Sequence, residues 1–183
     1  PQHLPELPDI ATDSTAVIPG PDRVFKDQIL DAAYTDVLAG NLDILDQIPE
    51  ASLALFEDEF PGRSVNQTGM LITTLTISTN LEHFGMDDEG IKRRQALSMA
   101  IDRDEITRTI FRDTQKPLRS FVSQLVPGYR ENTCGEACEF NPQKARALFE
   151  SAGGSAAVGG RLEIAYNVDG GHKAWVDATC NQL

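Results

Sequence analysis

Residues 91–111, IKRRQALSMAIDRDEITRTIF, decide the local fold of this chain. Asp102 divides the stretch, because it stands where an N-cap would start a second helix, with Glu105 three residues later as its partner in a capping box. The apolar residues before the cap share one helical face by their three- and four-residue spacing, namely Leu97, Ala100 and Ile101. The stretch therefore predicts two helices that meet at an N-cap, with the basic run 92–94 on a solvated helix face.

Two other segments carry patterns that accompany this one. The helix pair contains R-x-A-L-x-x-A-I-D-R, which runs from Arg94 to Arg103. Residues 38–44, LAGNLDI, end in G-x-x-D-I, and residues 141–154 begin with N-P-x-K-A-x-x-L and end in A-G-G. Three motifs in this order are a far stronger signal than one motif alone. Together they resemble the extracellular solute-binding proteins of family 5, which serve ABC importers of peptides and nickel, and residues 165–177 are most similar to actinobacterial members.

The resemblance implies an α/β fold, as part of a two-lobed periplasmic-binding-protein-like (type II) fold with a mixed sheet flanked by helices. Residues 1–66 are expected to be the tail of the first lobe, with an extended lead-in. Residues 67–183 are expected to be the start of the second lobe, truncated at the C-terminus. Family members are considerably longer than these 183 residues, so we expect the chain to be an excised piece.

Periodicity along the chain predicts the individual elements of that fold. Strands are expected where apolar and β-branched residues alternate or run together, at residues 24–30, 42–48, 70–79 and 161–168. Helices are expected from Asp31 to Gly40, after Pro49 as far as Phe60, at residues 142–152 and around Trp175. The alternation of strands with helices indicates a mixed, largely parallel sheet.

The resemblance also implies a function in transport. Proteins of this kind capture a solute between two lobes and deliver it to the membrane subunits of the importer, and an oligopeptide is the favoured solute here. The expected partners are a small solute and the ABC permease, without nucleic acid. No cofactor, metal site or catalytic group is expected. The implied location is extracellular or at the cell envelope, as a lipoprotein anchored through a preceding segment.

Five residues are candidate ligand contacts, because they lie at expected strand ends or in loops that face the cleft: Thr74, Thr76, Phe121, Asn167 and Asp169. Each has a structural alternative. The two threonines also suit the surface of a sheet, and Asn167 and Asp169 also suit a turn. The groups that grip a peptide's amino end are expected after residue 183, so this part of the protein is not expected to bind ligand well alone.

The chain has three cysteines, and whether they form disulfides relates to the redox compartment of the protein. Cys134 and Cys138 flank three small or polar residues, and this spacing permits a disulfide if the turn brings their α-carbons close. A metal or cluster site is the alternative, but zinc needs two further ligands and the three histidines are scattered singly. Cys180 is left over, and it has either a disulfide partner elsewhere or a role as a small buried hydrophobe.

Charge and composition argue against several functions. The chain has 28 acidic and 16 basic residues, so it lacks the positive charge that a nucleic acid backbone requires. The sequence contains no run of eighteen apolar residues that would span a membrane. Residues 62–66, GRSVN, lack the final glycine of a hydrolase nucleophile elbow, and the acidic run 87–89 fits a helix start better than a cation site. The competing hypotheses are a protein-interaction module that uses the Phe121 loop and, less favoured, a secreted hydrolase domain.

Overall fold

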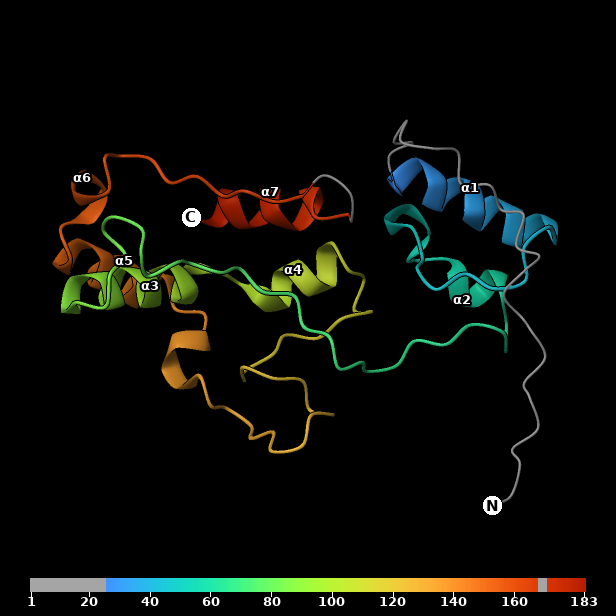
Figure 1. Cartoon of the computed structure of the whole chain (residues 1–183), viewed down its shortest axis with the longest axis horizontal. Coiled ribbons are helices and arrows are strands. Elements are labelled where there is room, and N and C mark those ends of the chain that lie inside the picture. The colour runs from blue at the N-terminus through green and yellow to red at the C-terminus, as the bar shows by residue number, and fades with distance from the viewer. Residues whose placement is uncertain (1–25, 168–170) are drawn as a thin grey trace, which may run out of the picture.

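The computed structural model of the protein describes residues 26–167 and 171–183. Helices are the regular elements of this part of the chain, and turns and extended segments join them (Figure 1). In chain order they are α1 (Lys26–Ala39), the 3-10 helix η1 (Glu50–Ser52), α2 (Phe56–Glu59), α3 (Asp88–Ala100), α4 (Arg103–Thr109), the 3-10 helix η2 (Gly135–Cys138), α5 (Pro142–Ser151), α6 (Gly154–Ala157) and α7 (Lys173–Gln182). No helix within the described ranges is long and apolar enough to cross a bilayer.

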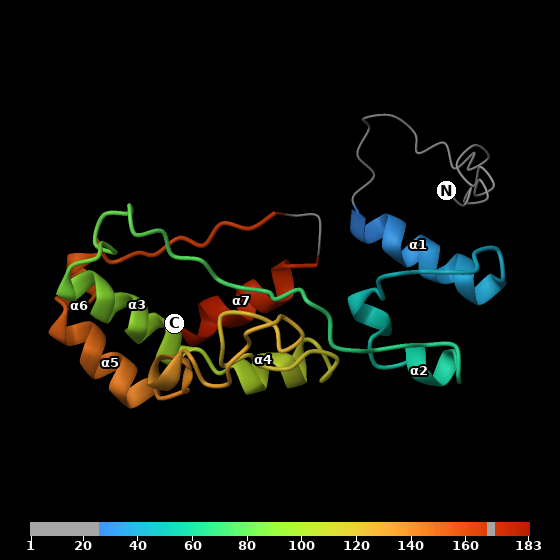
Figure 2. The ribbon, with the colours of Figure 1, turned by 60° about the horizontal axis from the view of Figure 1, so that its bottom comes forward.

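The helices form two groups, which both ribbon views show (Figures 1 and 2). Helices α1 and α2 lie together at one end of the molecule. At the other end α3, α5 and α6 pack together, with α4 and α7 nearer the middle. An extended segment, residues 65–80, runs from the first group to the second. Asn66 ties its start to the loop after α4, because Asn66 Nδ2 donates to the carbonyl oxygen of Thr114 at 3.3 Å.

The mixed sheet predicted for an α/β fold is wrong for the described residues, which contain no strand. Residues 70–79 are not helical, but a strand needs a neighbour that pairs its backbone N–H and C=O groups, and no described segment forms such a ladder with them. Leu71 is 94% exposed. The loop after α4 holds the start of this segment through a side chain instead, since Ser123 Oγ donates to the carbonyl oxygen of Gly69 at 2.6 Å.

The other three predicted strands are also wrong. Residues 26–30 belong to α1, so Asp31 lies inside a helix rather than at its start, and residues 24 and 25 lie outside the described range. Residues 42–48 are irregular, with Ile44 81% exposed. Residues 161–167 run extended without forming a strand (Figure 1), and residue 168 lies outside the described range. A short apolar run favours extended backbone, but a sheet also requires a second strand beside it.

The predicted helix pair in residues 91–111 is confirmed as α3 and α4. Asp102 is the N-cap of α4, and its carboxylate accepts a hydrogen bond from the backbone N–H of Glu105 at 2.9 Å. The reciprocal half of the capping box is wrong, because the backbone N–H of Asp102 donates to Gln182 Oε1 at 2.8 Å. Gln182 Nε2 also donates to the Glu105 carboxylate at 3.3 Å, so the end of α7 is tied to the start of α4.

Further helix predictions are confirmed in part. The helix expected at residues 142–152 is α5, and Asn141 caps it by accepting a hydrogen bond from Lys144 N at 3.0 Å. The helix expected around Trp175 is α7. Gly40 follows the last residue of α1 with a φ of 75°, a left-handed conformation that suits glycine after a helix. The segment after Pro49 forms η1 and the short α2 rather than one continuous helix.

The start of α3 confirms that the acidic run caps a helix. The Asp87 carboxylate accepts a hydrogen bond from the backbone N–H of Gly90 at 2.8 Å, and this bond holds the pKa of Asp87 below its ordinary value. Gly90 also allows the turn before α3 to approach the helix closely. A Cβ at this position would lie 2.2 Å from the carbonyl oxygen of Gly85, so a larger residue would displace the turn.

The solvated face predicted for the basic run is wrong. Arg93 is buried, with 5% of its surface exposed. Its guanidinium donates to the carbonyl oxygen of His83 at 2.7 Å and to that of Ala152 at 2.9 Å, and it pairs with Glu89 at 2.8 Å. Arg94 donates to two further carbonyl oxygens of the turn before α3, those of Phe84 and Gly85. The two arginines therefore hold together α3, the turn that precedes it and the end of α5.

Helices α3 and α5 lie side by side in both ribbon views (Figures 1 and 2). The residues buried in this group are mostly small, which lets the two backbones approach: Ala96, Ala145 and Ala152. Met99 fills the space beside them with 2% of its surface exposed. Its carbonyl oxygen accepts a hydrogen bond from Asn141 N at 2.8 Å, which joins the end of α3 to the cap of α5.

A separate aromatic cluster holds α1 against α2. The ring of Tyr34 meets that of Phe60 edge to face, with centroids 5.7 Å apart, and its hydroxyl donates to the Glu59 carboxylate. Burial and then the neighbouring carboxylate raise the pKa of Tyr34 to about 12. Phe56, 4% exposed, completes this small core.

The Arg93 contacts predict a large difference between two neighbouring substitutions. Arg93→Met should lower the free energy of unfolding by about 2–4 kcal/mol, because hydrogen bonds from a charged donor contribute about 1.5–3 kcal/mol each and buried carbonyl oxygens would lose their partner. Lys92→Met, which removes a charge one position away, should change the free energy of unfolding by less than about 0.5 kcal/mol. Urea unfolding followed by circular dichroism measures both, and equal midpoints for the two variants would contradict the assignment.

Candidate functional site

The two threonines predicted as ligand contacts lie on the extended segment between the helix groups. Thr74 and Thr76 are exposed, whereas Leu75 and Ile77 between and beyond them are partly covered. Over residues 74–77 the alternation shows that the apolar side chains face the molecule and the hydroxyls face outward. The threonines are therefore available to a ligand but do not line a described cavity.

The structure does not bring the other three predicted contacts into one cavity with the threonines. Phe121 lies in the loop after α4 and is 72% exposed. Asn167 is exposed at the end of the extended segment before α7. Asp169 lies outside the described residues. Within the described ranges, the structure has two surface hollows beside the start of α4, which are detailed below. Phe121, Asn167, Thr74 and Thr76 do not line either of them.

Two hollows flank the start of α4 and share Asp104 and Pro117. The first has a volume of about 390 Å³ and is lined by α4 and the loop that follows it, with charged side chains of both signs: Asp102, Glu105, Arg108, Asp113 and Lys116. The second has a volume of about 340 Å³ and lies between the start of α4 and the segment around η2, where its walls include Arg119, Glu139 and Phe140.

Arg103 forms one wall of the second hollow and also closes the end of α3. Its Nη1 donates to the carbonyl oxygens of Ser98 at 2.9 Å and Ile101 at 3.3 Å, and its Nη2 donates to Ser98 Oγ at 2.8 Å. These acceptors are neutral, and among the described residues no carboxylate forms an ion pair with Arg103. Burial lowers the pKa of the Arg103 guanidinium below its usual range.

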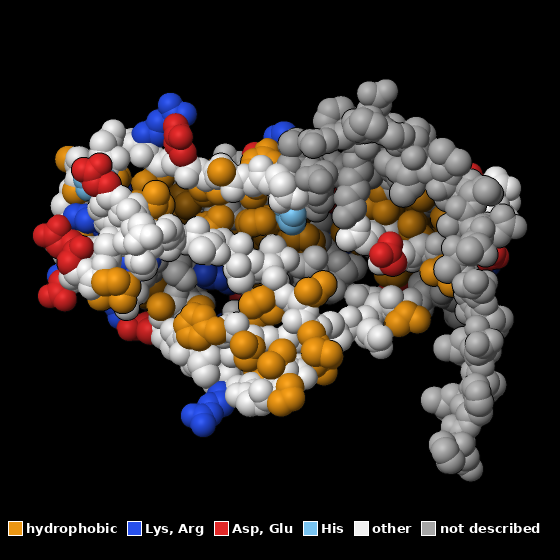
Figure 3. Space-filling view, viewed as in Figure 1, with side chains coloured by type: hydrophobic (Ala, Val, Ile, Leu, Met, Phe, Trp, Pro, Cys, Tyr) orange, Lys and Arg blue, Asp and Glu red, His pale blue; other side chains and the backbone are white. Residues whose placement is uncertain are grey.

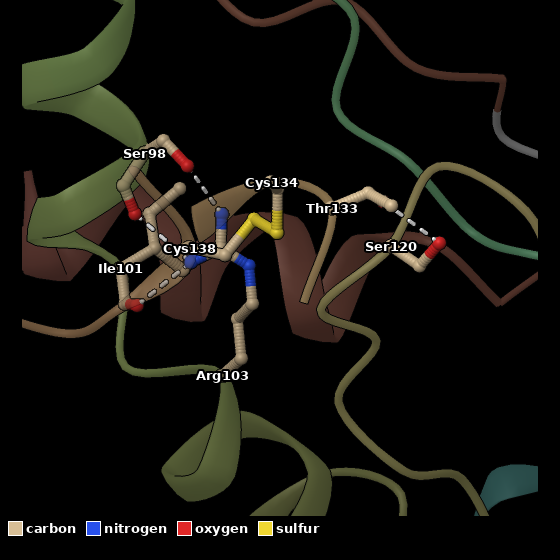
Figure 4. The surroundings of a disulfide bond; sticks show 7 residues. All are labelled: Ser98, Ile101, Arg103, Ser120, Thr133, Cys134 and Cys138. Atoms are coloured by element: carbon tan, nitrogen blue, oxygen red, sulfur yellow. Dashed lines mark hydrogen bonds between the residues drawn. A yellow bond between two sulfur atoms is a disulfide. The ribbon is translucent and has the colours of Figure 1, made fainter. Parts of the chain in front are cut away.

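A disulfide joins Cys134 and Cys138 across η2, with their α-carbons 5.8 Å apart (Figure 4). Two further bonds hold this loop: Cys134 N donates to the Arg119 carbonyl oxygen at 3.4 Å, and Thr133 Oγ1 donates to Ser120 Oγ at 3.0 Å. Cys180 is a free, exposed thiol on α7, so its interpretation as a buried hydrophobe is wrong.

Exposed apolar side chains gather near the loop after α4. Figure 3 shows them in orange over the lower middle of the molecule, where Figure 1 places the loop that follows α4. In that loop Phe121 is 72% and Leu125 52% exposed, and the extended segment held against it contributes Met70, which is 70% exposed. Ser123 and Gln124 link the two segments by hydrogen bonds to Gly69 and Thr68. Apolar surface of this kind often marks a contact with another protein surface or a ligand.

The chemistry of these features favours binding of a polar organic molecule. Both hollows carry acidic and basic side chains together, a lining that suits groups of either charge, such as the termini of a peptide. Within the described part of the chain, no group of three or more histidine, cysteine, aspartate or glutamate side chains is placed to hold a metal ion.

Comparison with protein families identifies the chain's relatives. A family model described as bacterial extracellular solute-binding proteins, family 5 (middle), matches residues 24–183. The chain belongs to this family. The match covers α1 through α7, including both arginines that hold α3 and the whole of the helix pair. A comparison with curated proteins gives no match.

Family 5 solute-binding proteins are non-catalytic binding proteins of ABC transport, found outside the cell or at its envelope. Membership confirms the resemblance that the three sequence motifs indicate. Family membership does not show whether the two hollows or the exposed apolar side chains near the loop after α4 bind the solute. The sequence interpretation missed both hollows, although Arg103, the last residue of the A-I-D-R motif, marks the second one.

The disulfide predicts a simple thiol count for these 183 residues. Under denaturing, non-reducing conditions one thiol, that of Cys180, should react with a thiol reagent, and three should react after reduction. A mutant Cys180→Ser should then show no reactive thiol before reduction and two afterwards. Three reactive thiols without reduction would exclude the Cys134–Cys138 pair.

Proposed function

We propose that the protein is part of the substrate-binding component of an ABC importer and captures an extracellular oligopeptide between two lobes. The family match over residues 24–183 is the observation that carries this proposal. In such a mechanism the open protein binds the solute weakly. The closed form is then selected because part of the ligand's contacts exist only in that form.

The lobe boundary belongs to this proposal. We place it between residues 66 and 67, with residues 1–66 in the first lobe and residues 67–183 in the second. The extended segment supports this position, because it starts next to the boundary and runs from the α1–α2 group to the α3–α5 group (Figure 2). A connection of this kind lets two packed groups move against each other while the chain remains continuous.

The ligand contacts also remain proposals. Thr74, Thr76 and Phe121 are exposed, so their hydroxyls and ring are open to a peptide without rearrangement of the core. Threonine hydroxyls would bind peptide backbone groups, and the Phe121 ring would cover an apolar side chain. Asn167 and Asp169 are proposed as further polar contacts, and Asp169 lies outside the described residues.

Delivery to the membrane completes the proposed function. We propose that the loaded protein docks on the importer's permease subunits, and that a lipid attached to a segment before residue 1 anchors it at the cell surface. The acidic balance of the chain, 28 acidic against 16 basic residues, agrees with a protein whose partners are a solute and a permease rather than a nucleic acid.

A second candidate function rests on the exposed apolar side chains near the Phe121 loop. Phe121, Leu125 and Met70 present apolar surface that a protein partner would cover, as expected for a non-catalytic interaction module. The two functions differ in what stabilises the protein. A solute-binding protein is stabilised by a small molecule, whereas an interaction module is stabilised only by another macromolecule.

A thermal-shift experiment on the complete gene product tests the transport function. An oligopeptide present at about 100 times its Kd should stabilise the protein by about 2.7 kcal/mol. This raises Tm by about 5–10 °C for a chain of about 150–250 residues, and by less for a longer one. A mixture of free amino acids with the same composition is the control for nonspecific effects. Screening short peptides, sugars and nickel complexes at millimolar concentration without any shift would contradict the proposal.

The same experiment tests the ligand contacts. Phe121→Ala should reduce the peptide-induced shift while leaving the unliganded Tm nearly unchanged, because the ring is 72% exposed. Leu125→Ala, which trims another exposed side chain of the same loop, is the matched control and should retain the full shift.

A further inference from the structure

The disulfide and Arg103 share one cavity. Cys138 and Arg103 both line the second hollow, and Figure 4 shows the Arg103 guanidinium in the surroundings of the disulfide with its bonds directed toward Ser98 and Ile101. Cys134 and Cys138 are each partly exposed rather than buried. Cys138 therefore lies on the same wall as a cation, whereas Cys134, its partner in the disulfide, lies outside the lining of the hollow.

The position of this cation is fixed by bonds that leave its charge unpaired. Nη1 of Arg103 donates to the carbonyl oxygens of Ser98 and Ile101, and Nη2 donates to Ser98 Oγ. These hydrogen bonds fix the guanidinium plane. The Nε–H group of Arg103 has no acceptor among the described residues, and no carboxylate of that part of the chain pairs with it. A partly desolvated cation without a counter-ion favours any anion that forms beside it.

We propose that the Cys134–Cys138 disulfide is an exchange site for small thiols, with Cys138 as the leaving sulfur and Arg103 as the positioning residue that stabilises its thiolate. A small-molecule thiolate attacks Cys134 Sγ, a new S–S bond forms between them, and the Cys134–Cys138 bond breaks. The electron pair of the broken bond stays on Cys138 Sγ as the thiolate. A second thiolate of the same kind then releases Cys134, so that the disulfide is reduced and one small-molecule disulfide is produced.

The physical reason for this assignment is the effect of a cation on sulfur chemistry. A nearby arginine lowers the pKa of a cysteine thiol, and a thiol of lower pKa leaves faster in exchange. Cys138 lines the hollow with Arg103, whereas Cys134 does not line it. The stabilised sulfur is therefore Cys138, and the sulfur that accepts the attack is Cys134.

The other charges around the hollow partly oppose one another. Arg119 adds a second cation, and Asp104 and Glu139 add two carboxylates. These three side chains belong to exposed residues, so solvent screens them more than it screens Arg103. Glu136, on η2 itself, pairs with Lys144 of α5. The least screened charge of the hollow is thus the positive one on Arg103.

The test uses the protein with Cys180→Ser, so that the two thiols of the site are the only ones in residues 1–183. After reduction and removal of the reductant, iodoacetamide is applied at a series of pH values, and peptide mass spectrometry follows each cysteine separately. Cys138 should show an alkylation midpoint at least about one pH unit below the ordinary thiol value near 8.5. Its midpoint should also lie below that of Cys134. This comparison within one protein needs no variant of Arg103.

Variants of the two arginines separate the charge from the fold. Arg103→Gln should raise the Cys138 midpoint by about one pH unit, which is about a tenfold loss of thiolate below both midpoints, and it should slow reduction of the disulfide by glutathione severalfold at pH 7. Arg103→Lys keeps the cation and should retain most of the low midpoint. Arg119→Gln is the matched control and should change the Cys138 midpoint little. Equal midpoints for Cys134 and Cys138, or an unchanged Cys138 midpoint in a folded Arg103→Gln protein, would overturn the proposal.

Discussion

The Arg93 guanidinium is the contact on which the larger helix group depends. It extends from α3 to the carbonyl oxygen of Ala152 at the end of α5 and to that of His83 in the turn before α3. Carbonyl groups at a helix end have no helical partner, and burying them without a hydrogen bond is costly. Arg93 supplies that hydrogen bond, while Ala96 and Ala145 let the two helices approach closely enough for the side chain to reach.

The sequence predicts the helices well and the sheet badly, for a physical reason. A helix satisfies its own backbone, so local signals are sufficient: Asp102 caps α4 as predicted, and Asn141 caps α5 by the same kind of bond, although that cap was not predicted from the sequence. A strand satisfies its backbone only through a second strand. Residues 70–79 have the composition of a strand, yet no described segment pairs with them. The burial of Arg93 was missed because its acceptor on Ala152 lies 59 residues away in the sequence.

The candidate sites show the same division between local and distant information. The spacing of Cys134 and Cys138 is local, and the structure places the two sulfurs in one disulfide. The hollow beside that disulfide also depends on Arg103 at the start of α4 and on Arg119 in the loop that follows it, so the local spacing of the cysteines does not indicate it. Motifs identify the family through residues that fold the protein. They leave the solute to be found by experiment, because one scaffold serves many ligands.

Hydrogen–deuterium exchange of the backbone amides in wild-type protein and Arg93→Met tests most directly whether one side chain joins α3 to α5. If Arg93 couples the two helices, the amides of α3 and α5 should lose protection together in the variant, while those of α1 should keep theirs. Unchanged protection in α5, with loss confined to α3, would show that α5 is held by other contacts and would contradict this account.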